Sequence, residues 1–357
     1  MYPHSYQVMP GDLVRALQKG DGGKMTDVER DGPKPTHVVP FDGRELAVDV
    51  SGDPDAYPVF LMHGMPGSRI GPKPRSIVLY RLGIKLISYD RPGYGQSSRM
   101  RGRSVFDAGA DVAAIADYLG LEKFSVVGRS GGGPHAMAAA AYSPDRVERA
   151  AMLVSAAPSD AEGLDWFEGM VESNREAYSA ADLQVAAQAE QDEDAGQWED
   201  GALIEKLRAR ASEVSEDPES MIAKIGPGLA SSDERVIGNV ALRALLTDTY
   251  TEAVRGRGEQ GPNSGGWIDD AMALRKSWGF KFNQVTCRVL LWHGMNDRFV
   301  PVGHTEWLAE QLRSTRLDAE SVELRLAPGV AHFGAVEVLP EVLGWLARPP
   351  ALVDSHR

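Results

Sequence analysis

Cysteine is almost absent from this sequence, since Cys287 is the only one among 357 residues. An intramolecular disulfide is therefore excluded, which fits a reducing compartment. Cys287 lies in the apolar run 285–293, and we interpret it as a small buried hydrophobic residue and not a nucleophile. Long hydrophobic runs are also missing: none approaches the ~20 residues that span a bilayer. The N-terminal segment lacks the apolar core of a signal peptide, so we expect a cytoplasmic protein.

Basic residues are scarce as well. The chain has 38 Lys and Arg against 51 Asp and Glu, a formal net charge of −13. Such a surface repels nucleic-acid backbones and anionic lipids, so neither is expected as a partner. The HExxH and CxxC patterns of zinc sites are missing too. We expect a small-molecule substrate, no metal, no organic cofactor, and a monomer or homodimer.

Secondary-structure patterns divide the chain into three parts. Residues 1–35 are polar and Gly-rich, which predicts a mobile extension. In residues 36–157 and 283–357 strand and helix patterns alternate, beginning with a hairpin whose turn is Asp42-Gly43. This alternation predicts an α/β fold with a mostly parallel sheet and helices on both faces. Residues 158–282 carry helical patches and no strand signal, which predicts an inserted helical cap.

The strongest chemical signal is the segment Gly128–Gly132, with the sequence GRSGG. It follows the predicted strand FSVVG and precedes an Ala-rich helix, the context that a G-x-S-x-G nucleophile turn requires. Small neighbours let the backbone close sharply around the serine, and the N-terminus of the helix favours a developing anion. We predict that Ser130 is a nucleophile.

A rival pattern overlaps this turn. Residues 131–136, GGGPHA, match the G-x-G-x-x-A fingerprint of dinucleotide-binding proteins. That fingerprint needs an acidic residue at the end of the next strand, where this chain has Leu153-Val154-Ser155. The nucleophile turn is therefore the favoured interpretation.

A second motif, His63-Gly64-Met65-Pro66-Gly67, ends an early apolar strand. A serine nucleophile needs N–H donors aimed at the carbonyl oxygen of its substrate as that oxygen gains negative charge. One donor is the N–H after the nucleophile, here Gly131, and the other comes from a loop after an early strand, here Met65. These two residues are the predicted oxyanion hole.

Asp297 and His332 complete a predicted catalytic triad with Ser130. Asp297 follows the strand VTCRVLLWHG, and His332 lies in the loop after the last strand. The order Ser, Asp, His along the chain is the order of α/β-hydrolases. Taken alone, Asp297 is interpreted equally well as an Asx-turn or helix-capping residue, and Asp160 is the alternative acid.

Together these motifs resemble the α/β-hydrolase superfamily over residues 37–347, in particular its capped subgroup and the bacterial proline iminopeptidase-like hydrolases. The residues that carry the resemblance are His63-Gly64-Met65-Pro66-Gly67, Asp90-Arg91-Pro92-Gly93-Tyr94-Gly95, Gly128–Gly132, Asp297 and His332. The resemblance implies an eight-stranded sheet with a helical cap between strands six and seven. Two positions depart from the peptidase pattern: Gly131 stands where Trp is usual, and Met65 stands where Gly is usual.

Four further residues are expected to line a substrate pocket. His63 and Arg129 belong to the two motifs, and Trp166 and Trp267 are aromatic residues of the insertion. The acidic run 190–194 is interpreted as a solvated helix end, with attraction of an amine substrate as the alternative.

The predicted activity is hydrolysis of an ester, lactone or thioester by two-step acyl transfer through the triad. The alternatives are an aminopeptidase or a C–C bond hydrolase with the same triad, or a non-hydrolytic ligand-binding protein on this fold. Haloalkane dehalogenases and epoxide hydrolases need a carboxylate nucleophile, so Ser130 argues against both.

Overall fold

The computed structural model describes residues 33–189, 201–257, 261–316 and 318–347. The extension predicted for residues 1–35 lies outside these ranges except for residues 33–35, and so does the acidic run 190–194. From Pro35 onward, the described residues form one compact unit. Among the helices of the described ranges, none is both long and apolar enough to cross a membrane.

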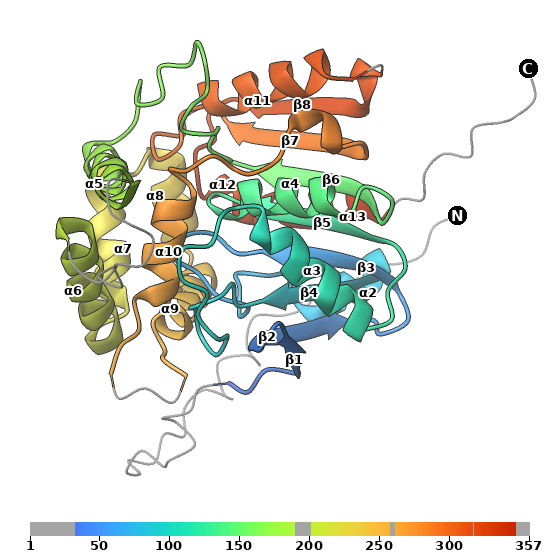
Figure 1. Ribbon diagram of the computed structural model, residues 1–357, viewed down its shortest axis with the longest axis horizontal. Coiled ribbons are helices and arrows are strands. Elements are labelled where there is room, and N and C mark those ends of the chain that lie inside the picture. The colour runs from blue at the N-terminus through green and yellow to red at the C-terminus, as the bar shows by residue number, and fades with distance from the viewer. Residues whose placement is uncertain (1–32, 190–200, 258–260, 317, 348–357) are drawn as a thin grey trace, which may run out of the picture. The chain divides into compact units, whose positions relative to one another are not determined.

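A single mixed sheet forms the centre of this unit (Figure 1). Its strands are β1 (His37–Phe41), β2 (Arg44–Gly52), β3 (Tyr57–Met62), β4 (Ile84–Tyr89), β5 (Phe124–Arg129), β6 (Val147–Leu153), β7 (Arg288–Gly294) and β8 (Val322–Ala327). The order across the sheet is β1-β2-β4-β3-β5-β6-β7-β8. β2 runs antiparallel to β1 and β4, and every other pair is parallel. The predicted eight-stranded, mostly parallel sheet is confirmed.

The first hairpin shows how local sequence sets the start of the sheet. Phe41 pairs with Arg44, so Asp42 and Gly43 form the connecting turn. Both adopt positive φ angles, 50° for Asp42 and 71° for Gly43. A two-residue hairpin turn of this kind favours Asp-Gly, because glycine has no Cβ to oppose a positive φ.

Helices cover both faces of the sheet. On one face lie α3 (Asp107–Tyr118), α4 (Gly132–Tyr142) and α11 (Gly303–Ser314), and on the other lie α2 (Ser76–Leu82) and α13 (Leu339–Leu346), preceded by the short α12 (Gly334–Glu337). Alternate side chains of β3 lie on opposite faces of the sheet. Phe60 and Met62 pack with α3 and α4, and Val59 and Leu61 pack with α2 and α13. Burial on both faces explains why this strand is a continuous apolar run.

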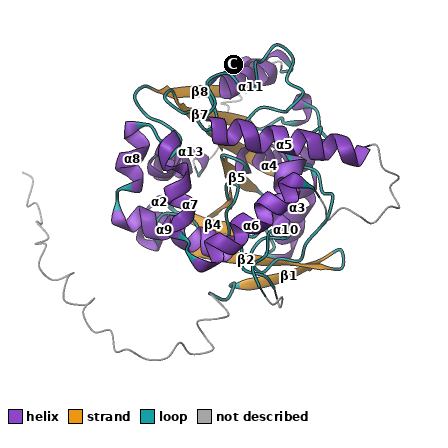
Figure 2. Cartoon of the chain, turned by 90° about the vertical axis from the view of Figure 1, so that its left-hand side faces the viewer, coloured by secondary structure: helices purple, strands orange, loops and turns teal. Residues whose placement is uncertain are grey.

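Between β6 and β7 the described residues form helices and no sheet strand. These helices are α5 (Glu172–Ala189), α6 (Ala202–Glu216), α7 (Glu219–Ile225), α8 (Ser231–Ile237), α9 (Val240–Ala253) and α10 (Gly265–Ala273). We call α5–α10 the helical insertion. Figure 1 shows it to the left of the strands, and Figure 2, viewed from that side, shows α5, α6 and α7 in front of the sheet.

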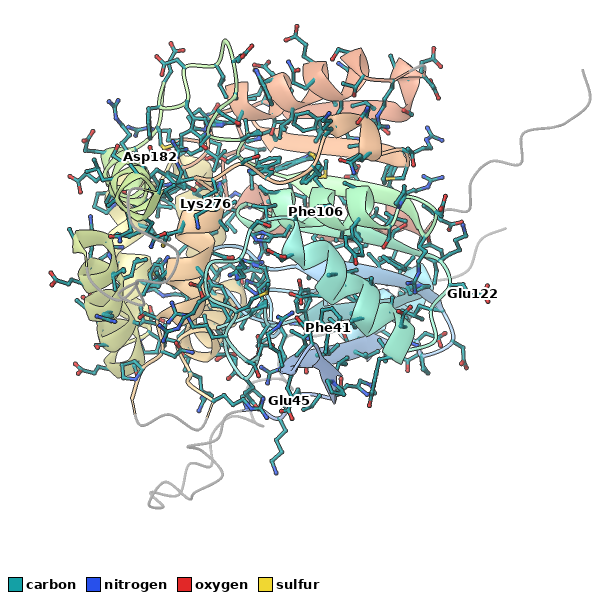
Figure 3. All side chains as sticks on the ribbon, in the orientation of Figure 1. Phe41, Glu45, Phe106, Glu122, Asp182 and Lys276 are labelled. Carbon is teal, nitrogen blue, oxygen red and sulfur yellow. The ribbon has the colours of Figure 1, made fainter. Side chains whose placement is uncertain are left out.

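The helical insertion has its own apolar core. That core includes Leu203 and Leu207 of α6, and the sheet loops add Tyr94, Phe299 and Phe333 to it. A polar contact adds to this packing, because Arg275, just after α10, donates two hydrogen bonds to Asp182 of α5, at 2.6 and 2.8 Å. Figure 3 labels Asp182 and, next to Arg275 in sequence, Lys276. The insertion is thus fastened to loops at one edge of the sheet.

Candidate active site

Ser130 occupies a sharp turn between β5 and α4. Its φ is 53°, a left-handed conformation that side chains rarely adopt. A Cβ on Gly128 would lie 2.0 Å from the carbonyl oxygen of Gly132, and a Cβ on Gly132 would lie 2.4 Å from that of Met62. Only glycine fits at both positions, so the GRSGG pattern is the sequence that this turn demands.

The two predicted oxyanion donors are neighbours in space. A Cβ on Gly131 would lie 2.9 Å from the Cβ of Met65 and 3.4 Å from its backbone nitrogen. A Cβ on Gly64 would likewise lie 3.8 Å from the Cβ of Ser130. The loop after β3 therefore packs directly against the turn that carries Ser130.

His332 and Asp297 are in direct contact. Nδ1 of His332 donates a hydrogen bond to Oδ2 of Asp297 at 2.7 Å, and the carboxylate is fully buried. The same oxygen lies 3.3 Å from Nε2 of His293. The other oxygen, Oδ1, accepts hydrogen bonds from the backbone N–H groups of Phe299, at 2.8 Å, and Val300, at 3.0 Å. The Asx-turn interpretation and the triad interpretation of Asp297 thus describe its two different oxygens.

These contacts determine the charges of the pair. Burial raises the pKa of Asp297, but the charge of His332 and hydrogen bonds from His293 and His332 outweigh it, so that this pKa falls well below its usual range. Burial lowers the pKa of His332, but the Asp297 charge and hydrogen bond raise it above its usual value. Asp160, the alternative acid, is exposed at the surface, so Asp297 is the better partner for His332.

One cavity joins these groups at the edge of the sheet where the parallel strands end. Ser130, Gly131, Met65 and His332 all line it. The helical insertion forms the facing wall with Leu203, Leu207, Met221, Ile225, Leu246, Trp267 and the polar residues described below. Ligands of open α/β sheets bind at this edge. Within the described residues, no cluster of His, Cys, Asp and Glu is arranged to hold a metal ion.

Of the four predicted pocket residues, Arg129 and Trp267 line the cavity, and His63 and Trp166 do not. His63 is buried behind the Met65 loop, where Nδ1 donates to the Gly64 carbonyl at 2.8 Å and Nε2 accepts from the Arg91 N–H at 3.2 Å. The His63 ring therefore stabilises the loop through these two hydrogen bonds. The prediction that His63 lines the pocket is wrong.

The prediction that Trp166 lines the pocket is also wrong, for a different reason. Its Nε1 donates to the carbonyls of Ala157 and Pro158, at 3.1 and 3.0 Å, and the guanidinium of Arg275 lies 4.0 Å from its ring centre. These partners hold it next to Tyr178, and of these two adjoining rings it is Tyr178 that lines the cavity. A sequence shows that an aromatic residue is present but not which of two adjoining rings faces the ligand.

A buried charge cluster lies beneath the cavity, and the sequence analysis missed its centre. Asp270 of α10 accepts hydrogen bonds from Arg91, with a closest distance of 2.5 Å, and from Arg103, at 2.6 Å. His135 Nε2 lies 3.5 Å from the same carboxylate. We call Asp270, Arg91, Arg103 and His135 the Asp270 cluster. All four side chains are at most 2% exposed.

The Asp270 cluster binds both segments that carry the predicted oxyanion donors. Arg91 donates to the carbonyls of His63, at 2.5 Å, and Gly64, at 3.0 Å, directly before Met65. Burial and the charge of Arg91 lower the pKa of His135 to about 3, so its ring is neutral. Its Nδ1 donates to the Gly131 carbonyl at 2.7 Å. The helical insertion therefore helps to position the loops on which Gly131 and Met65 lie.

Comparison with known proteins agrees with the observed fold. The family described as the alpha/beta hydrolase fold matches residues 57–337. The bifunctional esterase/perhydrolase DCH of Acinetobacter calcoaceticus is 33% identical over 34% of this chain and 45% of its own length. A proline iminopeptidase of Neisseria gonorrhoeae is 31% identical over 28% of this chain and 32% of its own length. The chain thus spans less than half the length of these two curated relatives.

Solved structures resemble the chain over more of its length. The enol-lactonase of Burkholderia xenovorans LB400 covers 86% of this chain, and 96% of its own chain is matched, with a TM-score of 0.55 and 15% identity. Similarity at this level of identity concerns the fold.

The Asp270 cluster predicts a large effect on stability. Replacing Asp270 by Asn leaves Arg91 and Arg103 buried without a full counter-charge. Breaking a buried ion pair in this way typically costs about 3–5 kcal/mol of the free energy of unfolding. Guanidinium titration followed by tryptophan fluorescence measures this change.

The matched control is Glu337→Gln, which removes the carboxylate from a surface pair with Arg235. Exposed ion pairs contribute little to the free energy of unfolding. We therefore expect the unfolding midpoint of Glu337→Gln to shift far less than that of Asp270→Asn. Equal midpoints for Asp270→Asn and the wild-type protein would contradict the role assigned to the cluster.

Proposed function

The chain belongs to the α/β-hydrolase fold family, and from this premise we propose that it is a serine hydrolase of carboxylic esters, lactones or thioesters. One observation carries the proposal: His332, bonded to Asp297, and Ser130 line the same cavity. Ser130 is the nucleophile, His332 the general base, and Asp297 the residue that positions the imidazole. The N–H groups of Gly131 and Met65 form the oxyanion hole.

The first step is acylation. Because Nδ1 of His332 donates to Asp297, the lone pair of a neutral ring is on Nε2, which accepts the proton of the Ser130 hydroxyl. Oγ forms a bond to the carbonyl carbon, and the carbonyl π electrons move to the oxygen that Gly131 and Met65 face. When the tetrahedral intermediate collapses, the bond to the leaving group breaks and His332 returns the proton to the departing alcohol or thiol.

The second step is deacylation. Water replaces the leaving group and gives one proton to His332 as its oxygen bonds to the acyl carbon. The ester bond to Ser130 then breaks, Oγ regains the proton from His332, and the carboxylic acid departs. The sum is one water consumed for one ester, lactone or thioester bond cleaved, with no net change in the protein.

The lining of the cavity favours this function over the aminopeptidase alternative. A peptidase that binds a free amino terminus needs a negative group for the ammonium, and none of the described residues that line the cavity is Asp or Glu. We also propose that residues 158–282 are a cap, because helices α5, α6, α7, α9 and α10 supply one wall of the cavity.

The central test is the hydrolysis of p-nitrophenyl esters from acetyl to octanoyl by the wild type and by Ser130→Ala. Removing the nucleophile leaves only the weak catalysis of the binding site, so we expect about a 10⁶-fold loss of kcat. Ser314→Ala, which changes an exposed serine of α11, is the control and keeps wild-type turnover. Persistent ester hydrolysis by a well-folded Ser130→Ala protein would refute the assignment.

The pH profile gives a second prediction. His332 accepts a proton only when it is neutral, and its pKa is raised by Asp297. Activity is therefore present above this pKa and is lost as the pH falls through it. We expect the acid limb of kcat/KM to have its midpoint above the ordinary histidine value of about 6.5. A midpoint below that value would disagree with the Asp297–His332 contact.

Asp297→Asn tests the positioning residue. Loss of the correct tautomer and of the stabilising charge typically costs about 10⁴-fold in kcat. The acid limb should also move to lower pH, because the charge that raises the pKa of His332 is gone, and a merely structural residue would not produce that shift. Asp160→Asn is the control, and a greater loss there than in Asp297→Asn would transfer the role to Asp160.

A further inference from the structure

The cavity carries positive charge in a strongly acidic protein. The whole chain has a net charge of −13, yet the cavity is lined by Arg129, Lys206, Arg210 and Lys224. No carboxylate among the described residues joins them in the lining. A cavity whose charged side chains all have the same sign, with low-dielectric walls, concentrates ligands of the opposite charge.

Of these cations, Arg129 is the one next to the proposed nucleophile in the sequence, since it directly precedes Ser130. Within the described part of the chain, its guanidinium has no carboxylate within 4 Å, and its hydrogen bond to the Pro72 carbonyl is long, at 3.5 Å. A guanidinium has five N–H donors, so most of its capacity is available to a ligand. Burial lowers the pKa of Arg129 to about 10, and the neighbouring Tyr250 opposes this shift. The group is thus charged at neutral pH and poorly solvated.

The helical insertion supplies the other cations from one face of α6. Leu203, Lys206, Leu207 and Arg210 follow the spacing of three and four residues that shares one helix face, and all four line the cavity. Within the described ranges, Arg210 also has no carboxylate partner within 4 Å. Apolar and cationic side chains therefore alternate along this wall.

The remaining two cations are partly neutralised from outside the cavity. Lys206 lies 3.5 Å from Glu176, and Lys224 pairs with Glu213. Both of these ion pairs are exposed to solvent, where they are weak. All four cations can therefore act on a ligand, and Arg129 and Arg210 differ from the lysines in having no carboxylate within 4 Å among the described residues.

We propose that the substrate of this site carries a free carboxylate at the end of a mainly apolar chain. This inference rests on the proposed hydrolase function and specifies its substrate class. Arg129 binds the carboxylate through its planar fork, which matches the two oxygens. Arg210 adds a second positive charge, and Leu203, Leu207, Met221, Ile225 and Leu246 contact the chain.

Matched ester pairs test the proposal. Monomethyl adipate and methyl hexanoate differ by a carboxylate on the acyl side, and 4-acetoxybutanoate and butyl acetate differ by one on the alcohol side. For at least one pair we expect the wild-type kcat/KM to favour the anion by about 10- to 100-fold, the effect of one hydrogen bond to a charged group. The preference should weaken as salt is added.

Variants of the cavity arginines test which residues cause the preference for the anionic ester. Arg129→Gln should lower the ratio of anionic to neutral kcat/KM by about 10- to 100-fold, and Arg210→Gln should lower it less. Arg175→Gln is the control: it removes an arginine of α5 that is half-exposed and lies outside the lining, so the ratio should not change. A wild-type ratio near one for both pairs, unchanged in Arg129→Gln, would overturn the proposal while the hydrolase function stands.

Binding to Ser130→Ala separates the two proposals when no ester is hydrolysed. Calorimetry would compare monomethyl adipate with methyl hexanoate in Ser130→Ala and in the double variant with Arg129→Gln. Tighter binding of the anion that is lost in the double variant supports the carboxylate subsite even if the hydrolase function fails. Equal affinity for the two esters overturns the subsite.

Discussion

Ser130 is held at a φ of 53° by a turn in which β5, α4 and the end of β3 approach one another too closely for any side chain. The glycines at 128 and 132 make that approach possible, and the backbone N–H of Ser130 is tied to the Leu153 carbonyl of β6 at 2.8 Å. The remaining parts of the site are arranged around this turn. His332, in the loop after β8, lines the same cavity as Ser130 and is hydrogen-bonded to Asp297 of the loop after β7, while Met65, in the loop after β3, lies beside Gly131.

The helical insertion is bound to this centre by buried charges as well as by apolar packing. Asp270 of α10 neutralises Arg91 and Arg103, and Arg91 in turn holds the carbonyls before Met65. Buried charges are costly unless they are paired. Separating α10 from the sheet loops would break these pairs, so the site and the insertion are expected to act as one unit.

A second buried group reinforces the connection. Arg69 binds Asp90, which follows β4, and Glu252 of α9 at 2.6 Å, and all three side chains are at most 1% exposed. Burial raises the pKa of Asp90 to about 6, against the opposing charge of Arg69. α9 and α10 are thus both anchored to the sheet by ions, whereas α6 and α7 contribute the cations that face the cavity. Within the insertion, the charges that anchor it to the sheet and the charges that line the cavity lie on different helices.

The sequence was sufficient for those features that depend on local rules. The sheet, the Asp42-Gly43 turn and the glycines around Ser130 follow from periodicity and steric limits, and the structure confirms the fold. Asp297 and His332 could be proposed from their places after strands, and the structure brings them together. Their catalytic role stays a prediction.

Other features depend on contacts between distant segments. Asp270 and Glu252 look like ordinary acidic residues of a helix, and only the folded chain shows that they meet arginines from the sheet loops. Lys206 and Arg210 carry a usable signal, because they share a helix face with Leu203 and Leu207, but that face has no meaning until the cavity is known. Motif membership predicts His63 in the pocket, and aromatic character predicts Trp166 there, but Gly64 and Tyr178, which they contact, line the cavity in their place.

We propose above all that Ser130, which lines the cavity, is an activated nucleophile. Its most direct test is reaction with a fluorophosphonate probe, followed by intact-mass measurement and peptide mapping of the modified residue. We expect a single adduct, located on Ser130, with a rate that falls as the pH drops through the pKa of His332. A folded protein that stays unmodified, or an adduct on another serine, would contradict it.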